Sequence, residues 1–190
     1  MPRTATRTTL ATLTAAALLA AGCTYRLSND QATWGCGAFR YEVNADGAGP
    51  EQLTAVHAAV QRYGAAVGRE VVFVGTTEER WSTGSRAADD PVLIEWFWPD
   101  DPGQPAALGF AEPFIREGAY VGGHLYLHPS LGDGAAGIVE RLTLHELGHI
   151  GGLDEVDAQD ELMNPNLPVD DWGQGELVGL GLTHDRCVAQ

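Results

Sequence analysis

The stretch HELGHIGGLDE, residues 145–155, constrains the fold of this 190-residue chain more than any other. His145 and His149 are four residues apart, so on a helix both imidazoles lie on one face and can reach one metal ion. Glu146, directly after the first histidine, is placed to hold a water molecule on that ion and to take its proton. The pattern predicts a zinc site carried by a helix, with Glu146 as the general base.

The residues after this helix extend the pattern. Gly152 stands where the helix has to stop and the chain has to turn back under the ion, which requires a left-handed conformation that glycine adopts without steric cost. The next candidate ligand is Glu155, and a glutamate beside two histidines is an acceptable zinc-ligand set. Asp154 and Asp157 are nearby alternatives for the third ligand. Met163 follows within the stretch LMNP.

Over residues 145–165 the chain resembles the metzincin metalloproteases, whose signature is an extended zinc helix followed by a methionine turn. The resemblance is to the matrixin-like branch and extends less specifically over most of 34–187. It implies an α+β domain with a twisted, mostly parallel sheet, one antiparallel edge strand, an active-site helix, a Met-turn and a C-terminal helix. The chain departs from the common pattern at Glu155, where most metzincins have histidine.

The resemblance also implies roles for individual residues. His145, His149 and Glu155 would be the zinc ligands, and Met163 would lie beneath the metal as a hydrophobic floor. A peptide substrate would bind as an added antiparallel strand, a mode that uses main-chain hydrogen bonds. The residues that would receive it are those of the predicted edge strand, Leu108, Gly109, Phe110 and Ala111.

The function implied is that of a zinc-dependent endopeptidase acting on peptides or proteins. A surface lipoprotein with the same fold and a lapsed metal site, acting as a binding or structural module, is the alternative. The intact Glu146 argues against it, because a binding module does not need a general base. Calcium is a further possibility in the Asp-rich loops at 99–101 and 131–134, although such loops are more often solvated turns.

The N-terminal segment predicts export. Residues 1–22 combine a positively charged start, an apolar stretch and small residues, which is the anatomy of a secretory signal peptide. The ending LLAAGC resembles a bacterial lipobox, so we expect Cys23 to carry a lipid that anchors the protein at the cell surface. The alternative is an ordinary signal peptide and a secreted protein. Residues 23–33 would then be the lipidated cysteine and a tether, and 34–190 the metalloprotease domain.

Charge and cysteine content narrow the remaining choices. A formal net charge of −15 argues against nucleic acid as a partner. Apart from the lipidated Cys23, the chain has two cysteines, Cys36 and Cys187. In an exported protein two such residues most simply form one disulfide. Two free thiols are the alternative. We expect the domain to act as a monomer.

Hydrophobic periodicity predicts the other elements. The segments FRYEV and GGHLYLHP alternate apolar and polar residues, as half-buried strands do, with Leu125 and Leu127 on one face of the second. Other segments carry apolar residues at helical spacing. We expect strands over 39–43, 71–75, 92–98, 108–113 and 122–129, and helices over 51–67, 135–150 and 172–180.

Overall fold

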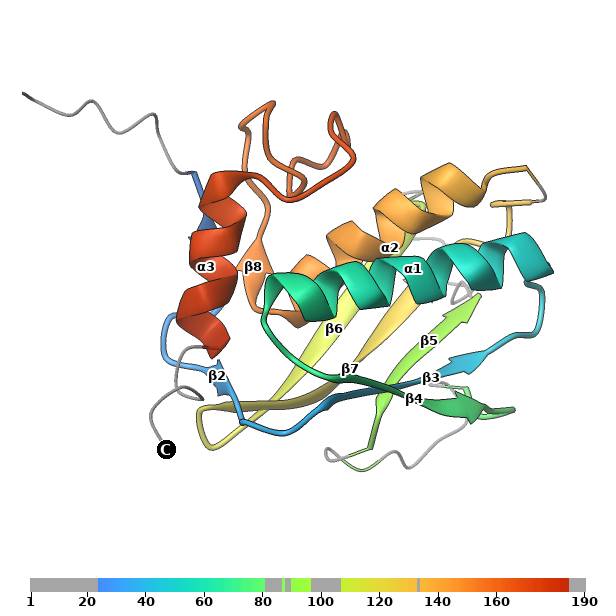
Figure 1. The fold of residues 1–190 in the computed structure, drawn as a ribbon, viewed down its shortest axis with the longest axis horizontal. Coiled ribbons are helices and arrows are strands. Elements are labelled where there is room, and N and C mark those ends of the chain that lie inside the picture. Colours follow the sequence, from blue (N-terminus) through green and yellow to red (C-terminus); the bar gives the residue numbers. More distant parts are fainter. Residues whose placement is uncertain (1–23, 81–86, 88–89, 97–106, 133, 185–190) are drawn as a thin grey trace, which may run out of the picture.

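The computed structural model describes residues 24–80, 87, 90–96, 107–132 and 134–184. These residues form a six-stranded sheet, a second sheet of two short strands, and three helices (Figure 1). The elements are β1 (Arg26–Leu27), β2 (Thr33–Trp34), β3 (Phe39–Asn44), α1 (Pro50–Ala66), β4 (Val71–Thr76), β5 (Val92–Trp96), β6 (Gly109–Arg116), β7 (Ala119–Leu127), α2 (Ala136–Ile150), β8 (Leu153–Asp154) and α3 (Gln174–His184).

The large sheet is mostly parallel. Its strands follow the order β2-β7-β5-β3-β4, with every pair parallel, and β6 adds to β7 as an antiparallel strand. Strand β3 connects to β4 through α1, which is the crossover that a parallel pair requires. The predicted α+β architecture with one antiparallel edge strand is confirmed.

Strand β7 lies at the centre of this arrangement and differs from its prediction. Leu125 and Leu127 are buried, as expected, but so are His124 and Tyr126 on the other face. The strand is therefore buried on both faces: on the second face His124 Nε2 lies 2.7 Å from Glu95 Oε1 of β5, and the ring of Tyr126 packs against those of His124 and Phe110. The alternating pattern had predicted a strand with one solvated face.

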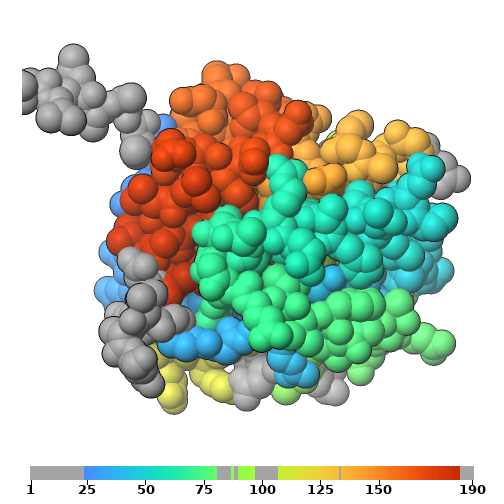
Figure 2. Space-filling model, in the orientation of Figure 1, coloured from blue at the N-terminus to red at the C-terminus, as the bar shows by residue number. Residues whose placement is uncertain are grey.

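Helices α1 and α2 lie side by side across one face of the sheet (Figure 1). The inner side of α1 is lined by small and branched apolar residues, and Arg62 of α1 forms an ion pair with Glu140 of α2 at 2.9 Å. Figure 2 shows the same face of the molecule in space-filling form, with the residues of α1 between those of α2 and those of β4. This packing fixes α2, which carries the histidine motif, against strands β6 and β7.

The end of α2 follows the prediction made from its glycines. Gly152 has a φ of +95°, and its N–H donates to the carbonyl of His149. A Cβ atom at Gly152 would lie 2.7 Å from the hydroxyl oxygen of Tyr120, so both the backbone conformation and the space require glycine. The chain reverses there and enters β8.

Residues 24–33, predicted to be a tether, are partly structured. Strand β1 pairs antiparallel with β8, and β2 pairs parallel with the start of β7. Backbone hydrogen bonding therefore draws this polar segment onto the domain, which its composition did not indicate. None of the helices in the described ranges is long and apolar enough to cross a membrane. Cys23 and the predicted signal peptide lie outside the described residues.

The predicted disulfide also remains a prediction. Cys36 is exposed, and Cys187 lies outside the described residues. The last helix, α3, begins two residues later than predicted and continues to His184. It packs against β2 and β8, next to the end of α2.

His184 is part of the core that α3 completes. Its Nδ1 donates to the carbonyl of Leu180 at 2.8 Å, its Nε2 lies 3.2 Å from the hydroxyl of Tyr63, and its ring stacks on Trp34. Burial lowers the pKa of His184 to about 4. The folded state therefore keeps this imidazole neutral.

This burial predicts a loss of stability in mild acid. The unfolded chain takes up a proton at His184 below pH 6.5, whereas the folded chain does so only near pH 4, so the stability present above pH 6.5 is lost as pH falls. Between pH 7 and pH 5 the free energy of unfolding should fall by about 2 kcal/mol through this residue. Urea unfolding of the wild type and of His184→Gln measures it: the variant should show a flatter pH dependence. Parallel curves would contradict the assignment.

Candidate metal centre

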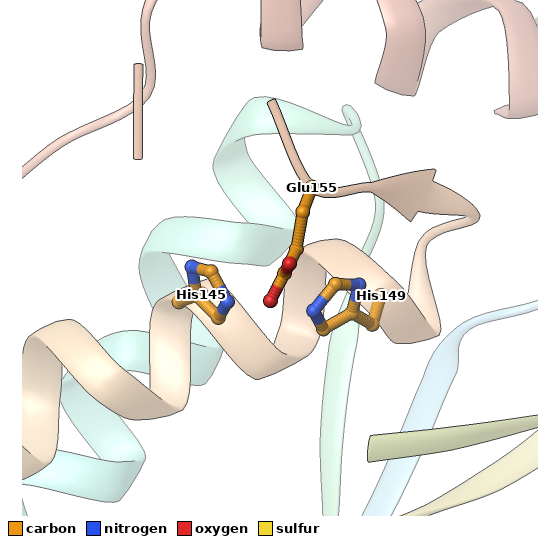
Figure 3. Close-up of side chains that lie close together, drawn as sticks. All are labelled: His145, His149 and Glu155. Carbon is orange, nitrogen blue, oxygen red and sulfur yellow. The ribbon is translucent and has the colours of Figure 1, made fainter. Parts of the chain in front are cut away.

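Helix α2 places two of the three predicted metal ligands. His145 and His149 lie one turn apart, with ring centroids 5.0 Å apart and ring planes at 88°. Glu155, from the segment after β8, points its carboxylate between the two imidazoles (Figure 3). One ligand atom from each of the three residues lies within 4.8 Å of the others, so one ion can contact all three.

Glu155 reaches the position of the third ligand because pairing with β1 holds β8, the strand that precedes it. Leu27 pairs with Leu153, and Ser28 N–H donates to the carbonyl of Gly152 at 2.9 Å. Asp154, one of the two alternative ligands, turns instead toward Arg26, with which it forms an ion pair at 3.0 Å. Of the three carboxylates considered from the sequence, the metal-capable group of the described residues includes Glu155 alone.

Both histidines are oriented by backbone carbonyls. Nδ1 of His145 lies 2.8 Å from the carbonyl oxygen of Leu162, and Nδ1 of His149 lies 3.0 Å from that of Leu153. A carbonyl oxygen only accepts, so each Nδ1 carries the proton. In a neutral imidazole Nε2 then keeps its lone pair, which is the form that a metal ligand needs. Burial and the neighbouring His149 lower the pKa of His145 to about 4, which favours that neutral form.

Glu146 is buried beside this group. It is 4% exposed, and burial, assisted by the charge of Glu155, raises the pKa of its carboxyl group to about 8. A cation bound by His145, His149 and Glu155 would oppose both effects and favour the carboxylate. The donor set and the electrostatics of this site therefore fit a cation.

A glycine of the edge strand makes room for Glu146. A Cβ atom at Gly109 would lie 2.6 Å from Glu146 Oε1 and 3.0 Å from Leu142 Cδ1. Only glycine lets β6 approach α2 this closely without moving the carboxylate. Gly109, predicted as part of a substrate strand, thus also determines where Glu146 lies.

Met163 packs against α2 at Gly148. It is 1% exposed, and its sulfur occupies the space that a side chain at Gly148 would need. The Met-turn predicted from LMNP is therefore packed directly against the motif helix. This contact fixes the distance between the helix and the segment that follows Glu155.

A cleft runs between β6 and the histidine motif. Its volume is about 400 Å³, and its walls include three of the four predicted substrate-strand residues. Leu108, the fourth, lines an adjoining cavity of about 300 Å³. The residues shared by both cavities are Ala107, Gly109, His145, Glu146 and Glu155. The candidate ligands, the candidate base and the edge strand thus share one opening.

Two buried residues near the centre were not anticipated from the sequence. Glu161 and Glu176 are 2% and 0% exposed. Glu176 accepts a hydrogen bond from Met163, and Glu161 accepts one from Gly175 in the first turn of α3. Glu176 follows Gly173 by three residues, the spacing of a glutamate that caps its own helix, and this signal was available in the sequence. Glu161 carries no such local signal, because its partners are 14 and 15 residues away.

The comparisons with known proteins agree with this geometry at the level of the fold. No family model and no curated protein matches the chain. A crystal structure of archaemetzincin from Methanopyrus kandleri superposes with a TM-score of 0.58 at 15% identity, over 82% of this chain and 98% of that one. The chain has a metzincin-like fold. A second structure, metalloproteinase-II from Bacteroides fragilis, matches more weakly, with a TM-score of 0.47 at 14% identity, over 83% of this chain and 55% of that one.

The metzincin-like fold explains the layout of the site without assigning an activity. The sequence predicted a sheet with one antiparallel edge strand and a motif helix. The structure has the antiparallel strand β6, and α2 packs against it. At 15% identity the likeness concerns the fold. The chemistry has to be argued from the side chains of this chain.

Proposed function

We propose that this protein is a zinc-dependent endopeptidase of the matrixin-like type. The observation that carries the proposal is the convergence of His145, His149 and Glu155 beside a buried Glu146, in a cleft bordered by strand β6. Two histidines, one carboxylate and an open position form a catalytic zinc-ligand set, whereas structural zinc sites are closed by four protein ligands.

In this proposal three residues hold the metal ion and Glu146 transfers protons. Zinc held by His145, His149 and Glu155 would supply the Lewis acidity that lowers the pKa of a water molecule to about 7. Glu146 takes the proton of the water that attacks the scissile carbonyl and later delivers a proton to the leaving amine. Its position next to Gly109 places the carboxylate at the edge where a peptide would lie.

Strand β6 binds the substrate in this proposal. It pairs with β7 on one side, and among the described residues no strand pairs with its other edge. An extended peptide that adds to this edge forms main-chain hydrogen bonds, which suit many sequences. The scissile bond would then lie in the cleft that Glu146 and Gly109 both line.

The cellular setting that we propose comes from the N-terminal sequence. The signal peptide and lipobox-like ending support export and anchoring through Cys23. A cell-surface peptidase would meet peptides or proteins outside the cell. An envelope protein, a host protein and a small peptide all fit an edge-strand mode of binding.

Zinc stoichiometry tests the proposal first. We expect one zinc per chain by elemental mass spectrometry after dialysis against a mild chelator. We also expect cleavage of an unstructured protein such as casein, lost on treatment with a strong chelator and restored by zinc. A folded protein that holds no zinc would contradict the proposal and support the alternative of a lapsed enzyme that acts as a binding module.

A further inference from the structure

One peptide unit joins His145 to a buried carboxylate of the last helix. The carbonyl of Leu162 accepts the Nδ1 proton of His145 at 2.8 Å. The N–H of the same peptide unit, that of Met163, donates to Oε1 of Glu176. The Leu162–Met163 unit is thus held from both ends, by the imidazole on one side and by the carboxylate on the other.

Glu176 is itself fixed by the start of α3. It is fully buried, and its second oxygen, Oε2, accepts the N–H of Gly173 at 2.7 Å. Gly173 immediately precedes α3, so this bond is one half of a capping box. The carboxylate therefore has little freedom, and the peptide unit that it holds has equally little.

Glu161 completes the cap from a distant part of the chain. Its Oε1 accepts the N–H of Gly175 at 3.1 Å, and its Oε2 accepts that of Glu176 at 3.4 Å. These are N–H groups that the side chain of an N-cap residue would normally satisfy, but Gly173 has no side chain. A Cβ atom at Gly173 would collide with Glu161 Oε2, so the position of the Glu161 carboxylate requires glycine at residue 173.

The two carboxylates are stabilised by backbone N–H groups and by the positive end of the α3 dipole. Burial raises the pKa of Glu176, and the charge of Glu161 adds to this, while the N–H groups of Met163, Gly173 and Leu162 oppose it. Glu161 and Glu176 differ in one respect. Only Glu176 accepts from the peptide unit that contacts His145.

We propose that Glu176 is a positioning residue for His145, acting through the Leu162–Met163 peptide unit. This inference rests on the proposed function only in taking His145 as a metal ligand. A carboxylate that accepts the N–H of a peptide polarises the peptide and makes its carbonyl a stronger acceptor. The Leu162 carbonyl then holds the Nδ1–H tautomer and the ring orientation of His145, and so directs the Nε2 lone pair toward the ion.

Two matched variants separate positioning from folding. Glu176→Gln and Glu161→Gln each remove one buried charge and replace one accepting oxygen by an NH₂ group, which cannot accept. Both weaken the cap of α3, so both should lower the melting temperature. Only Glu176→Gln disturbs the peptide unit next to His145.

The first readout needs neither metal nor activity. Nitrogen-15 NMR of histidine side chains in the metal-free protein, at about pH 7.5, reports which ring nitrogen carries the proton. We expect His145 to be the Nδ1–H tautomer in the wild type and in Glu161→Gln. In Glu176→Gln the Nε2–H tautomer of His145 should increase on the order of tenfold, because a hydrogen bond of the usual strength is weakened.

The second readout is zinc affinity, measured by competition with a chromophoric chelator well below the melting temperatures. Glu176→Gln should bind zinc roughly 10–100-fold more weakly, the range seen for residues that orient a ligand. Glu161→Gln should stay within about threefold of the wild type on the same grounds. An unchanged tautomer and an unchanged zinc affinity in Glu176→Gln would overturn the inference, and so would equal losses in both variants. A wild type that binds no zinc would overturn the proposed function, while the tautomer readout would still decide the role of Glu176.

Discussion

Glu146→Gln is expected to lose about 10²–10⁴-fold of the peptidase activity, the contribution typical of a positioned general base, and to keep its zinc. Glutamine has nearly the same shape as glutamate and fits beside Gly109, but its amide cannot take a proton from water. Because Glu146 is not one of the three grouped ligands, the metal affinity should change little. Initial rates of peptide hydrolysis and zinc content, measured on the same preparation, check both parts.

The control for this variant is another glutamate of the same helix. Glu140 lies on α2 and pairs with Arg62 of α1, away from the histidines. Glu140→Gln should keep full activity and lose at most about 1 kcal/mol of stability, as partly exposed ion pairs usually do. If Glu146→Gln lost its zinc as well as its activity, Glu146 would be part of the metal binding and not a separate base. Retained activity would remove it from the mechanism.

The motif and its helix could be predicted because their information is local. His145 and His149 are separated by one helical turn, and Gly152 marks the end of α2 by its backbone conformation alone. Strand β3 and helix α1 could be predicted for the same reason, since burial of one face imposes a period on the sequence. Such patterns need no knowledge of what lies opposite.

The rest depended on contacts between distant segments. The polarity of residues 24–33 indicates a tether, yet β1 pairs with β8 across 126 or more residues and brings Glu155 to the histidines. Glu161 has no local pattern at all, because it caps a helix that begins 13 residues later. The burial of the second face of β7 depends on side-chain contacts with Glu95 of β5 and Phe110 of β6, and not on the alternation of β7 itself.

Asp154 shows the same limit within the site. Its sequence neighbourhood left it as an alternative ligand to Glu155, since the two carboxylates are adjacent. Strand β8 ends at Asp154, which is paired with Arg26 of β1 and directed toward it, whereas Glu155 follows the strand. The side of the strand that faces the histidines could not be deduced without the pairing of β1 with β8.

Glu155→Gln is expected to weaken zinc binding by at least about 100-fold, beyond the upper end of what residues behind the ligands contribute. The variant replaces a charged oxygen ligand by a neutral amide oxygen, which binds zinc less strongly. Glu155→Asp should be intermediate, because its carboxylate is shorter by one methylene group. Chelator competition measures the three affinities.

Asp154→Asn and Asp157→Asn are the matched controls, since each removes one neighbouring negative charge without touching the three grouped ligand atoms. Asp154→Asn also breaks the exposed ion pair with Arg26, which should cost at most about 1 kcal/mol and leave zinc affinity near the wild-type value. Equal zinc retention in the wild type and Glu155→Gln would refute the ligand assignment, and a loss in Asp154→Asn or Asp157→Asn would transfer it.

A ligand role and a structural role for Glu155 also differ in the metal-free protein. Burial raises the pKa of Glu146, and the negative charge of Glu155 raises it further. Glu155 is itself exposed, so its removal leaves no cavity. Glu155→Gln should therefore keep or slightly raise the melting temperature of the metal-free protein while it loses zinc. A residue that only supported the fold would instead lower that temperature, and the affinity would fall because the site itself had unfolded.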